Sequence, residues 1–142
     1  MRKAIASLLR WQAVRLLRRV NPQIVCIAGS IGKTSTTQAI ASSLESKLKV
    51  RKTFGNYNTD IGIPCSLFQQ RIPSHIANPF SWVVLLCKNE LKILSAKKHT
   101  FDVAVLELGT DSIGEIATYA WLKPDIAVVT AVAPEHMEIF KT

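Results

Sequence analysis

The residues with the clearest chemical potential form the run 28–35, Ala-Gly-Ser-Ile-Gly-Lys-Thr-Ser. It follows an apolar segment, 24–27, and leads into a helix-like stretch, 34–48. A strand, a glycine turn and a helix in this order aim free backbone N–H groups and the positive end of a helix dipole at an anion. Lys33 would neutralise outer phosphates, and the Thr34 hydroxyl would bind Mg²⁺. The predicted phosphate-binding loop comprises Gly29, Ser30, Ile31, Gly32, Lys33, Thr34 and Ser35.

This loop is shorter than the full P-loop pattern. That pattern has a glycine five residues before Gly32, where this chain has Ile27. An ordinary glycine turn is therefore the alternative interpretation of the remaining Gly-x-x-Gly-Lys-Thr string. The strand before the loop and the helix after it favour phosphate binding.

Two further residues are candidate metal ligands. Glu107 ends the apolar run 103–107, and a carboxylate buried there needs a partner because an unpaired buried charge is costly. That partner is either Mg²⁺ or a structural contact, such as a salt bridge or a helix cap. His136 is a second candidate ligand, although a lone loop histidine is more commonly just solvated.

A dense polar loop, 55–64, is the remaining candidate. Asn and Asp in such a loop commonly shape turns. By its place after a predicted strand, the loop is also positioned to contact a substrate. The candidate substrate-binding residues are Asn56, Asn58, Thr59 and Asp60.

These candidates must be positioned by alternating strands and helices. Continuous apolar strands separated by helices predict an α/β fold of the P-loop type, with a mostly parallel sheet flanked by helices. Ligands bind beyond the carboxyl ends of such strands, where the candidate residues fall after four successive strands. The predicted strands are 24–27, 49–54, 101–108 and 125–130, and the predicted helices are 1–20, 34–48, 80–98 and 113–122, with 66–70 as the end of a further short helix. The rough apolar stripe of the helix 80–98 is Trp82, Leu85, Leu86, Leu91 and Leu94.

Charge is distributed unevenly over the 142 residues. The net charge is +8, but six of the 18 basic residues and no acid lie in the first twenty positions. The body is therefore close to neutral, and we expect no nucleic-acid partner.

The three cysteines, Cys26, Cys65 and Cys87, lack metal-ligand spacing. Cys26 and Cys87 lie in apolar runs and are predicted to be core residues, which is consistent with a reducing cytoplasm.

Residues 1–21 form a unit of their own, a basic amphipathic helix, followed by one domain portion over 22–142. Packing of the helix on the domain is one interpretation, and peripheral contact of residues 1–20 with an anionic membrane surface is the other. The apolar run is too broken to span a bilayer. The predicted apolar stripe is Ile5, Leu8, Leu9, Ala13, Leu16 and Val20.

Four ordered motifs resemble the Mur ligase family, from about Ile24 to the end. They are the loop 29–34, the stretch 55–64, the pair Glu107-Leu108-Gly109 with Gly114-Glu115-Ile116, and Lys123-Pro124-Asp125 leading to His136. Related amide ligases, of the folylpolyglutamate and cyanophycin synthetase types, share the same ATPase core.

The resemblance implies a cytoplasmic, ATP-dependent ligase of peptidoglycan precursor synthesis that forms amides through an acyl phosphate. Its implied substrates are a UDP-linked muramoyl peptide and a dipeptide amine, and its implied cofactors are ATP and Mg²⁺. The implied catalytic residues are Lys33, Glu107 and His136; Thr34 and Glu107 would hold one Mg²⁺, and His136 would help to hold a second.

Departures from the family pattern predict a fragment. Only about twenty residues precede the first strand, and the chain ends at Thr142, before the rest of the central domain and the amine-binding domain. The family often has asparagines at Thr130 and Ala131. Two other functions stay open: a nucleotide-binding switch or membrane-associated NTPase without ligase chemistry, and a degenerate structural protein.

Overall fold

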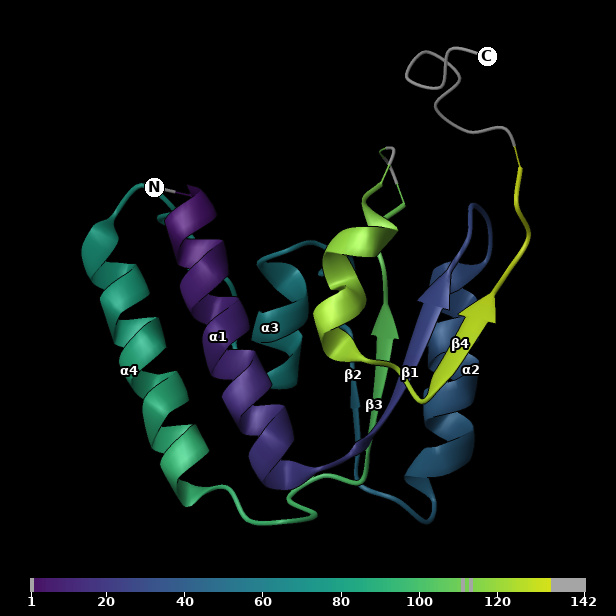
Figure 1. Ribbon diagram of the computed structural model, residues 1–142, viewed down its shortest axis with the longest axis horizontal. Helices are drawn as coiled ribbons and strands as arrows, with labels where there is room; N and C mark the ends of the chain where they lie inside the picture. Colours follow the sequence, from purple (N-terminus) through teal and green to yellow (C-terminus); the bar gives the residue numbers. More distant parts are fainter. Residues whose placement is uncertain (1, 111, 113, 134–142) are drawn as a thin grey trace.

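The computed structural model describes residues 2–110, 112 and 114–133 (Figure 1). Helices and strands alternate along most of the chain. The elements are α1 (Arg2–Val20), β1 (Gln23–Ala28), α2 (Lys33–Glu45), β2 (Val50–Lys52), α3 (Gly62–Leu67), α4 (Pro79–Ser95), β3 (Val103–Glu107), the 3-10 helix η1 (Ile116–Leu122) and β4 (Ile126–Val129).

The strands form one parallel sheet in the order β2-β3-β1-β4. The predicted α/β fold with a parallel sheet is thus confirmed. In the register of the two central strands, Ile27 of β1 lies opposite Glu107 of β3. This pairing brings the loop after β1 and the Glu107 carboxylate to the same edge of the sheet.

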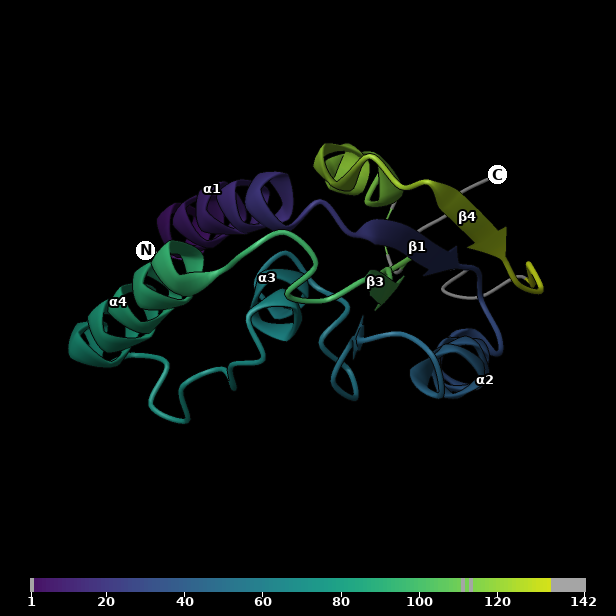
Figure 2. The same ribbon diagram turned by 90° about the horizontal axis from the view of Figure 1, so that it is seen from below.

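Side chains of the central strands alternate between the two faces of the sheet, as the pleat of a strand requires. Val25, Ile27, Val103 and Val105 pack against α2 on one face. Their neighbours along the strands pack against α1, α3 and η1 on the other face. α4 lies beyond this second layer, against α1, as the two views show (Figures 1 and 2).

The N-terminal helix is part of this packing. Leu9, Ala13, Leu16 and Val20 are each no more than 1% exposed, so most of the predicted apolar stripe faces the core. Leu8 is the exception, because it lies at the margin of the buried face. The structure thus has the packed arrangement, and contact of residues 1–20 with a membrane stays a proposal.

Three expectations about the elements were wrong. The short helix expected to end within 66–70 is α3, which ends at Leu67 but begins at Gly62, inside the predicted loop; Pro64 is tolerated there because first-turn N–H groups have no intrahelical partner. The strand predicted to be buried near 125–130 is β4, which is mostly exposed because it lies at the sheet edge. In place of the predicted α-helix 113–122, the described residues form a turn followed by the 3-10 helix η1.

The helix predicted at 80–98 is α4, and its buried face differs from the expected stripe. Trp82, Leu85, Asn89 and Ile93 are buried, whereas Leu91 and Leu94 are exposed. Cys87, expected in the core, is exposed on this helix. The expected stripe departs from the buried face at Asn89, because this polar residue occupies a buried position where apolar periodicity would place an apolar one.

Candidate nucleotide-binding site

The loop between β1 and α2 has the geometry of an anion cradle. Gly32 has a φ of 87° and serves as the N-cap of α2 without a side-chain hydrogen bond to the helix. The first-turn N–H groups are thus left without a side-chain cap, at the positive end of the helix dipole. A Cβ at Gly29, whose φ is 132°, would collide with the Thr130 side chain. Both glycines are therefore required by the backbone.

Lys33 lies over this loop. Its ammonium Nζ donates to the Gly29 carbonyl at 2.7 Å and to Thr110 Oγ1 at 3.3 Å. Thr110 in turn donates its hydroxyl to the same Gly29 carbonyl at 3.0 Å. The cation is thus held at the mouth of the loop by neutral acceptors, which a phosphate would outcompete because its negative charge adds an ion–ion attraction to the hydrogen bond.

Glu107 is buried beside the first turn of α2. Its Oε2 accepts the Thr34 hydroxyl at 2.9 Å, and its Oε1 accepts Asn58 Nδ2 at 3.3 Å. Among the described residues no ion pair involves Glu107, so the salt-bridge interpretation finds no support there. The carboxylate is satisfied by two neutral donors, one from the first turn of α2 and one from the polar loop.

The Thr34 and Glu107 oxygens fit Mg²⁺. Mg²⁺ prefers oxygen ligands and is usually held by one or two carboxylates together with substrate phosphates and water. A hydroxyl and a carboxylate facing each other at the phosphate loop provide such a set. The described part of the chain has no group of three His, Cys, Asp or Glu side chains that would hold an ion alone. The remaining ligands would therefore come from nucleotide and water.

The structure brings only part of the polar loop to this site. Asn58 reaches Glu107, and its carbonyl accepts the backbone N–H of Gly109 at 2.8 Å. Thr59 Oγ1 accepts the Gly62 N–H at 3.1 Å and so shapes the turn into α3. Asp60 forms an exposed ion pair with Arg2 of α1 at 3.1 Å. The Asn56 side chain is exposed.

A model of the Mur ligase middle domain matches residues 27–75 and 87–142. The chain belongs to the Mur ligase family. The matched residues include the phosphate loop, the polar loop, Glu107 and His136, whereas residues 76–86, within and before the first half of α4, are skipped.

Individual Mur ligases match nearly the whole chain. The UDP-N-acetylmuramoyl-tripeptide–D-alanyl-D-alanine ligase of Borreliella burgdorferi is 30% identical over 138 residues, 96% of this chain and 24% of that protein. The enzyme of the same name from Haemophilus influenzae is 31% identical over 144 residues, 98% of this chain and 25% of that protein. Most of α1 thus lies within the matched part, which extends the resemblance beyond its expected start.

Solved structures of Mur ligases are also similar to this chain. The MurF ligase of Thermotoga maritima in complex with ADP aligns with a TM-score of 0.62 and 27% identity, over 94% of this chain and 25% of that one. MurF from Acinetobacter baumannii aligns with a TM-score of 0.66 and 24% identity, over 98% of this chain and 24% of that one. The chain spans about a quarter of the length of these relatives.

The segment after β4 holds the phosphate loop of this Mur ligase chain through backbone groups and through the Thr130 hydroxyl. The Ser30 N–H donates to the Ala131 carbonyl at 2.9 Å, and Ile31 forms an antiparallel bridge with Ala131. The Thr130 hydroxyl donates to the Ala28 carbonyl at 3.2 Å. These contacts need no asparagine side chains, and no sequence signal predicted them. His136 lies outside the described residues, so its predicted role stays a prediction.

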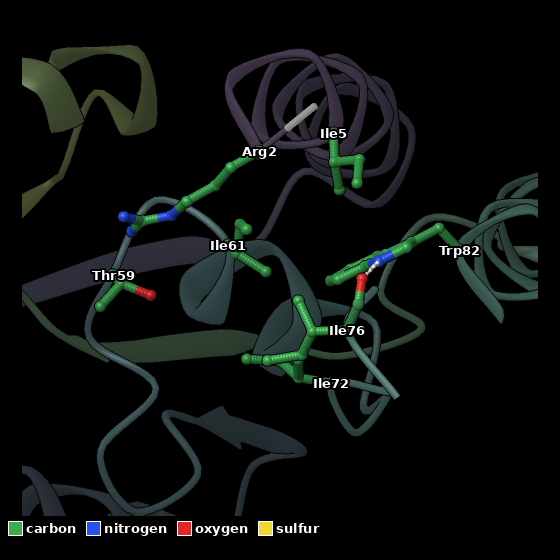
Figure 3. A pocket seen from close by; sticks show the side chains of 7 residues that line it. All are labelled: Arg2, Ile5, Thr59, Ile61, Ile72, Ile76 and Trp82. Atoms are coloured by element: carbon green, nitrogen blue, oxygen red, sulfur yellow. Dashed lines mark hydrogen bonds between the residues drawn. The ribbon is translucent and has the colours of Figure 1, made fainter. Parts of the chain in front are cut away.

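An apolar pocket of about 260 Å³ lies beside the polar loop (Figure 3). Trp82 closes one side, and its indole N–H donates to the Ile76 carbonyl at 2.8 Å. Thr59 and Arg2 provide the polar groups of its rim. Sequence reasoning missed this pocket because its apolar lining comes from separate segments: Ile5, Ile61, Ile72, Ile76 and Trp82.

The buried cysteines take no part in the site. Burial raises the pKa of the Cys26 and Cys65 thiols to about 12, so both stay protonated at neutral pH. A protonated thiol is a poor nucleophile and metal ligand. Cys26 therefore acts as a core residue, as expected.

Proposed function

We propose that the protein carrying this chain is an ATP-dependent amide ligase of peptidoglycan precursor synthesis. The observation that carries the proposal is the meeting of Lys33, Thr34 and Glu107 at one sheet edge in a Mur ligase middle domain. The likeness to an ADP-bound MurF supports ATP as the nucleotide. A nucleotide switch without ligase chemistry would not account for the polar loop at the same edge.

In this proposal the acid substrate's carboxylate attacks the γ-phosphorus of ATP, giving an acyl phosphate and ADP. The amine then attacks the acyl carbon, phosphate leaves, and the amine loses a proton. Lys33 and the N–H groups of the loop 29–35 bind and orient the phosphates. Mg²⁺, when bound by Thr34 and Glu107, would neutralise the charge that accumulates on the phosphate oxygens.

Asn58 is a positioning residue in this scheme. Its amide N–H holds one Glu107 oxygen, while its own carbonyl is fixed by Gly109 and by the Tyr119 hydroxyl at 2.9 Å. The carboxylate is thereby held toward Thr34. Asn56, Thr59 and Asp60 are proposed to face the acid substrate, and His136 to help hold a second Mg²⁺.

The names of the relatives suggest the substrates. We propose a UDP-linked muramoyl tripeptide as the acid and D-alanyl-D-alanine as the amine, by analogy with the ligases of Borreliella and Haemophilus. We also propose that the reaction takes place in the cytoplasm, with peripheral membrane contact through residues 1–20.

A three-component assay of the complete protein tests this proposal. ADP release is expected only when acid, amine and Mg²⁺-ATP are all present, with one ADP and one phosphate formed for each amide. The control omits either the acid or the amine. ATP hydrolysis at the full rate without the acid or the amine would contradict ligase chemistry and favour the nucleotide switch.

A further inference from the structure

α1 and α4 form a helical layer that lies away from the nucleotide-binding loop (Figures 1 and 2). The two helices run side by side, joined by Gln12 Nε2 to the Leu86 carbonyl at 3.0 Å and by Arg15 to Glu90 at 2.8 Å. Arg19 continues the contact at the Ala96 carbonyl, at 2.7 Å. The inner faces of both helices are thus occupied by contacts within the described residues, whereas their outer faces are exposed.

The outer face of α4 carries an apolar stripe. Its members are Phe80, Val83, Leu91 and Leu94, which are 71%, 53%, 67% and 63% exposed, and the exposed Cys87 lies between them. Spacings of three and four residues put them on one side of the helix. Large side chains exposed along a whole helix exceed the scattered apolar residues of an ordinary surface.

α1 extends this stripe on the side next to α4. Leu8 is 48% exposed and lies one turn before Gln12, which contacts α4. Trp11 is 56% exposed and lies under the Arg15 guanidinium, 4.4 Å from the ring centre. Since Arg15 is paired with Glu90 of α4, both apolar residues lie at the junction of the two helices.

Positive charge is concentrated in the same layer. Residues 2–20 and 79–98, which are α1, α4 and the three residues after α4, contain ten of the 18 basic residues and one of the 10 acidic residues, Glu90, which Arg15 neutralises. Two of the ten are engaged elsewhere, since Arg2 pairs with Asp60 and Lys92 donates to the Phe68 carbonyl. The remainder of the chain is therefore nearly neutral. The ten basic residues are Arg2, Lys3, Arg10, Arg15, Arg18, Arg19, Lys88, Lys92, Lys97 and Lys98.

We infer that the outer face of α1 and α4 docks on an anionic lipid surface. Apolar side chains flanked by Lys and Arg are what an interfacial helix presents to acyl chains and headgroups. A second copy of this face would bring two strongly basic layers together, and nucleic acid would leave the apolar stripe unburied. None of the helices in the described ranges is long and apolar enough to cross a membrane.

This inference goes beyond the ligase proposal and does not depend on it. The family model skips residues 76–86, so the start of the stripe lies outside the part that carries the nucleotide site. Docking through α1 and α4 leaves the face covered by α2 pointing away from the lipid (Figure 2). The main contact is therefore the exposed stripe of α4, with Leu8 and Trp11 of α1 beside it, and not the buried residues of the α1 stripe.

Co-sedimentation of the complete protein with lipid vesicles tests the inference. We expect binding to vesicles of equal parts phosphatidylglycerol and phosphatidylcholine at low salt, much weaker binding to phosphatidylcholine alone, and weakening by 0.5 M NaCl at a Debye length of about 4 Å. The charge variant R18Q/K97Q/K98Q should bind about a hundredfold more weakly, since each basic residue near an anionic leaflet contributes on the order of 1 kcal/mol, or about fivefold.

The stripe variant F80S/L91S/L94S should lose at least about tenfold in vesicle binding while keeping its nucleotide affinity. Controls remove the same number of basic or apolar side chains from other exposed positions: K47Q/K49Q/K123Q for charge and I116S/I126S/V129S for apolar surface. Both controls should bind vesicles as the parent does. Absence of binding to anionic vesicles, equal losses in the controls, or a dimer that the stripe variant converts to a monomer would overturn the inference.

Discussion

Replacing Lys33 with alanine in the complete protein is expected to lower kcat for ATP-dependent amide formation by a factor of about 10²–10³. The Lys33 ammonium lies at the mouth of the loop, held only by neutral acceptors that a phosphate can replace. Removing a preorganised positive charge from the transferred phosphoryl group takes away stabilisation that is largest in the transition state. The measurement is the steady-state rate of amide formation at saturating acid and amine.

The control for this substitution is Lys47→Ala, which removes an exposed lysine just beyond α2. Lys33→Arg keeps the charge but replaces a compact ammonium by a planar fork, and it should restore little of the rate. Thermal unfolding should change little in all three variants. A Lys33→Ala enzyme that forms amide at the parent rate would show that the loop does not hold the reacting phosphates.

Replacing Glu107 with glutamine is expected to raise the Mg²⁺ concentration required for half-maximal rate and to lower kcat about a hundredfold. The reason is that an amide oxygen is a much weaker Mg²⁺ ligand than a carboxylate, while the size of the side chain is unchanged. Stability should change by only about 1 kcal/mol, because the neutral amide no longer carries the desolvation cost of a buried charge. The measurement is the Mg²⁺ dependence of the rate beside a thermal melt.

This pair of readouts separates a metal ligand from a structural carboxylate. If Glu107 only anchored Thr34 and Asn58, the substitution would destabilise the fold and leave the Mg²⁺ dependence unchanged. Thr34→Ser should behave nearly as the parent because it retains the hydroxyl, whereas Thr34→Ala should shift the Mg²⁺ dependence in the same direction as Glu107→Gln. Glu45→Gln, an exposed carboxylate on α2, is the matched control.

The parts of the site that lie on regular elements could be predicted from the sequence. The apolar run 103–107 marked a buried strand, and a carboxylate at its end marked a residue needing a partner. Two glycines followed by Lys33 and Thr34 marked the loop, and the structure requires both glycines through a positive φ and a close approach. These features depend on residues adjacent in the sequence or on the regular spacing of apolar residues along one element.

The parts that depend on distant partners could not be predicted. Asp60 pairs with Arg2 across 58 positions of the chain, and nothing local to the polar loop indicates this contact. Ala131 holds Ser30 through its carbonyl, which every residue type has, so its side chain carries no signal. The exposure of Cys87, Leu91 and Leu94 on α4 was not predicted, because apolar periodicity shows that a helix has a face but not what covers it.

The central claim, that this Mur ligase chain contributes to amide formation through an acyl phosphate, is tested most directly by following oxygen. The acid substrate is prepared with ¹⁸O in its reacting carboxylate, and the phosphate released during amide formation is analysed by mass spectrometry. The account predicts one ¹⁸O atom transferred to phosphate for each amide formed, since a carboxylate oxygen bridges to phosphorus in the intermediate. Phosphate that carries no ¹⁸O would contradict it.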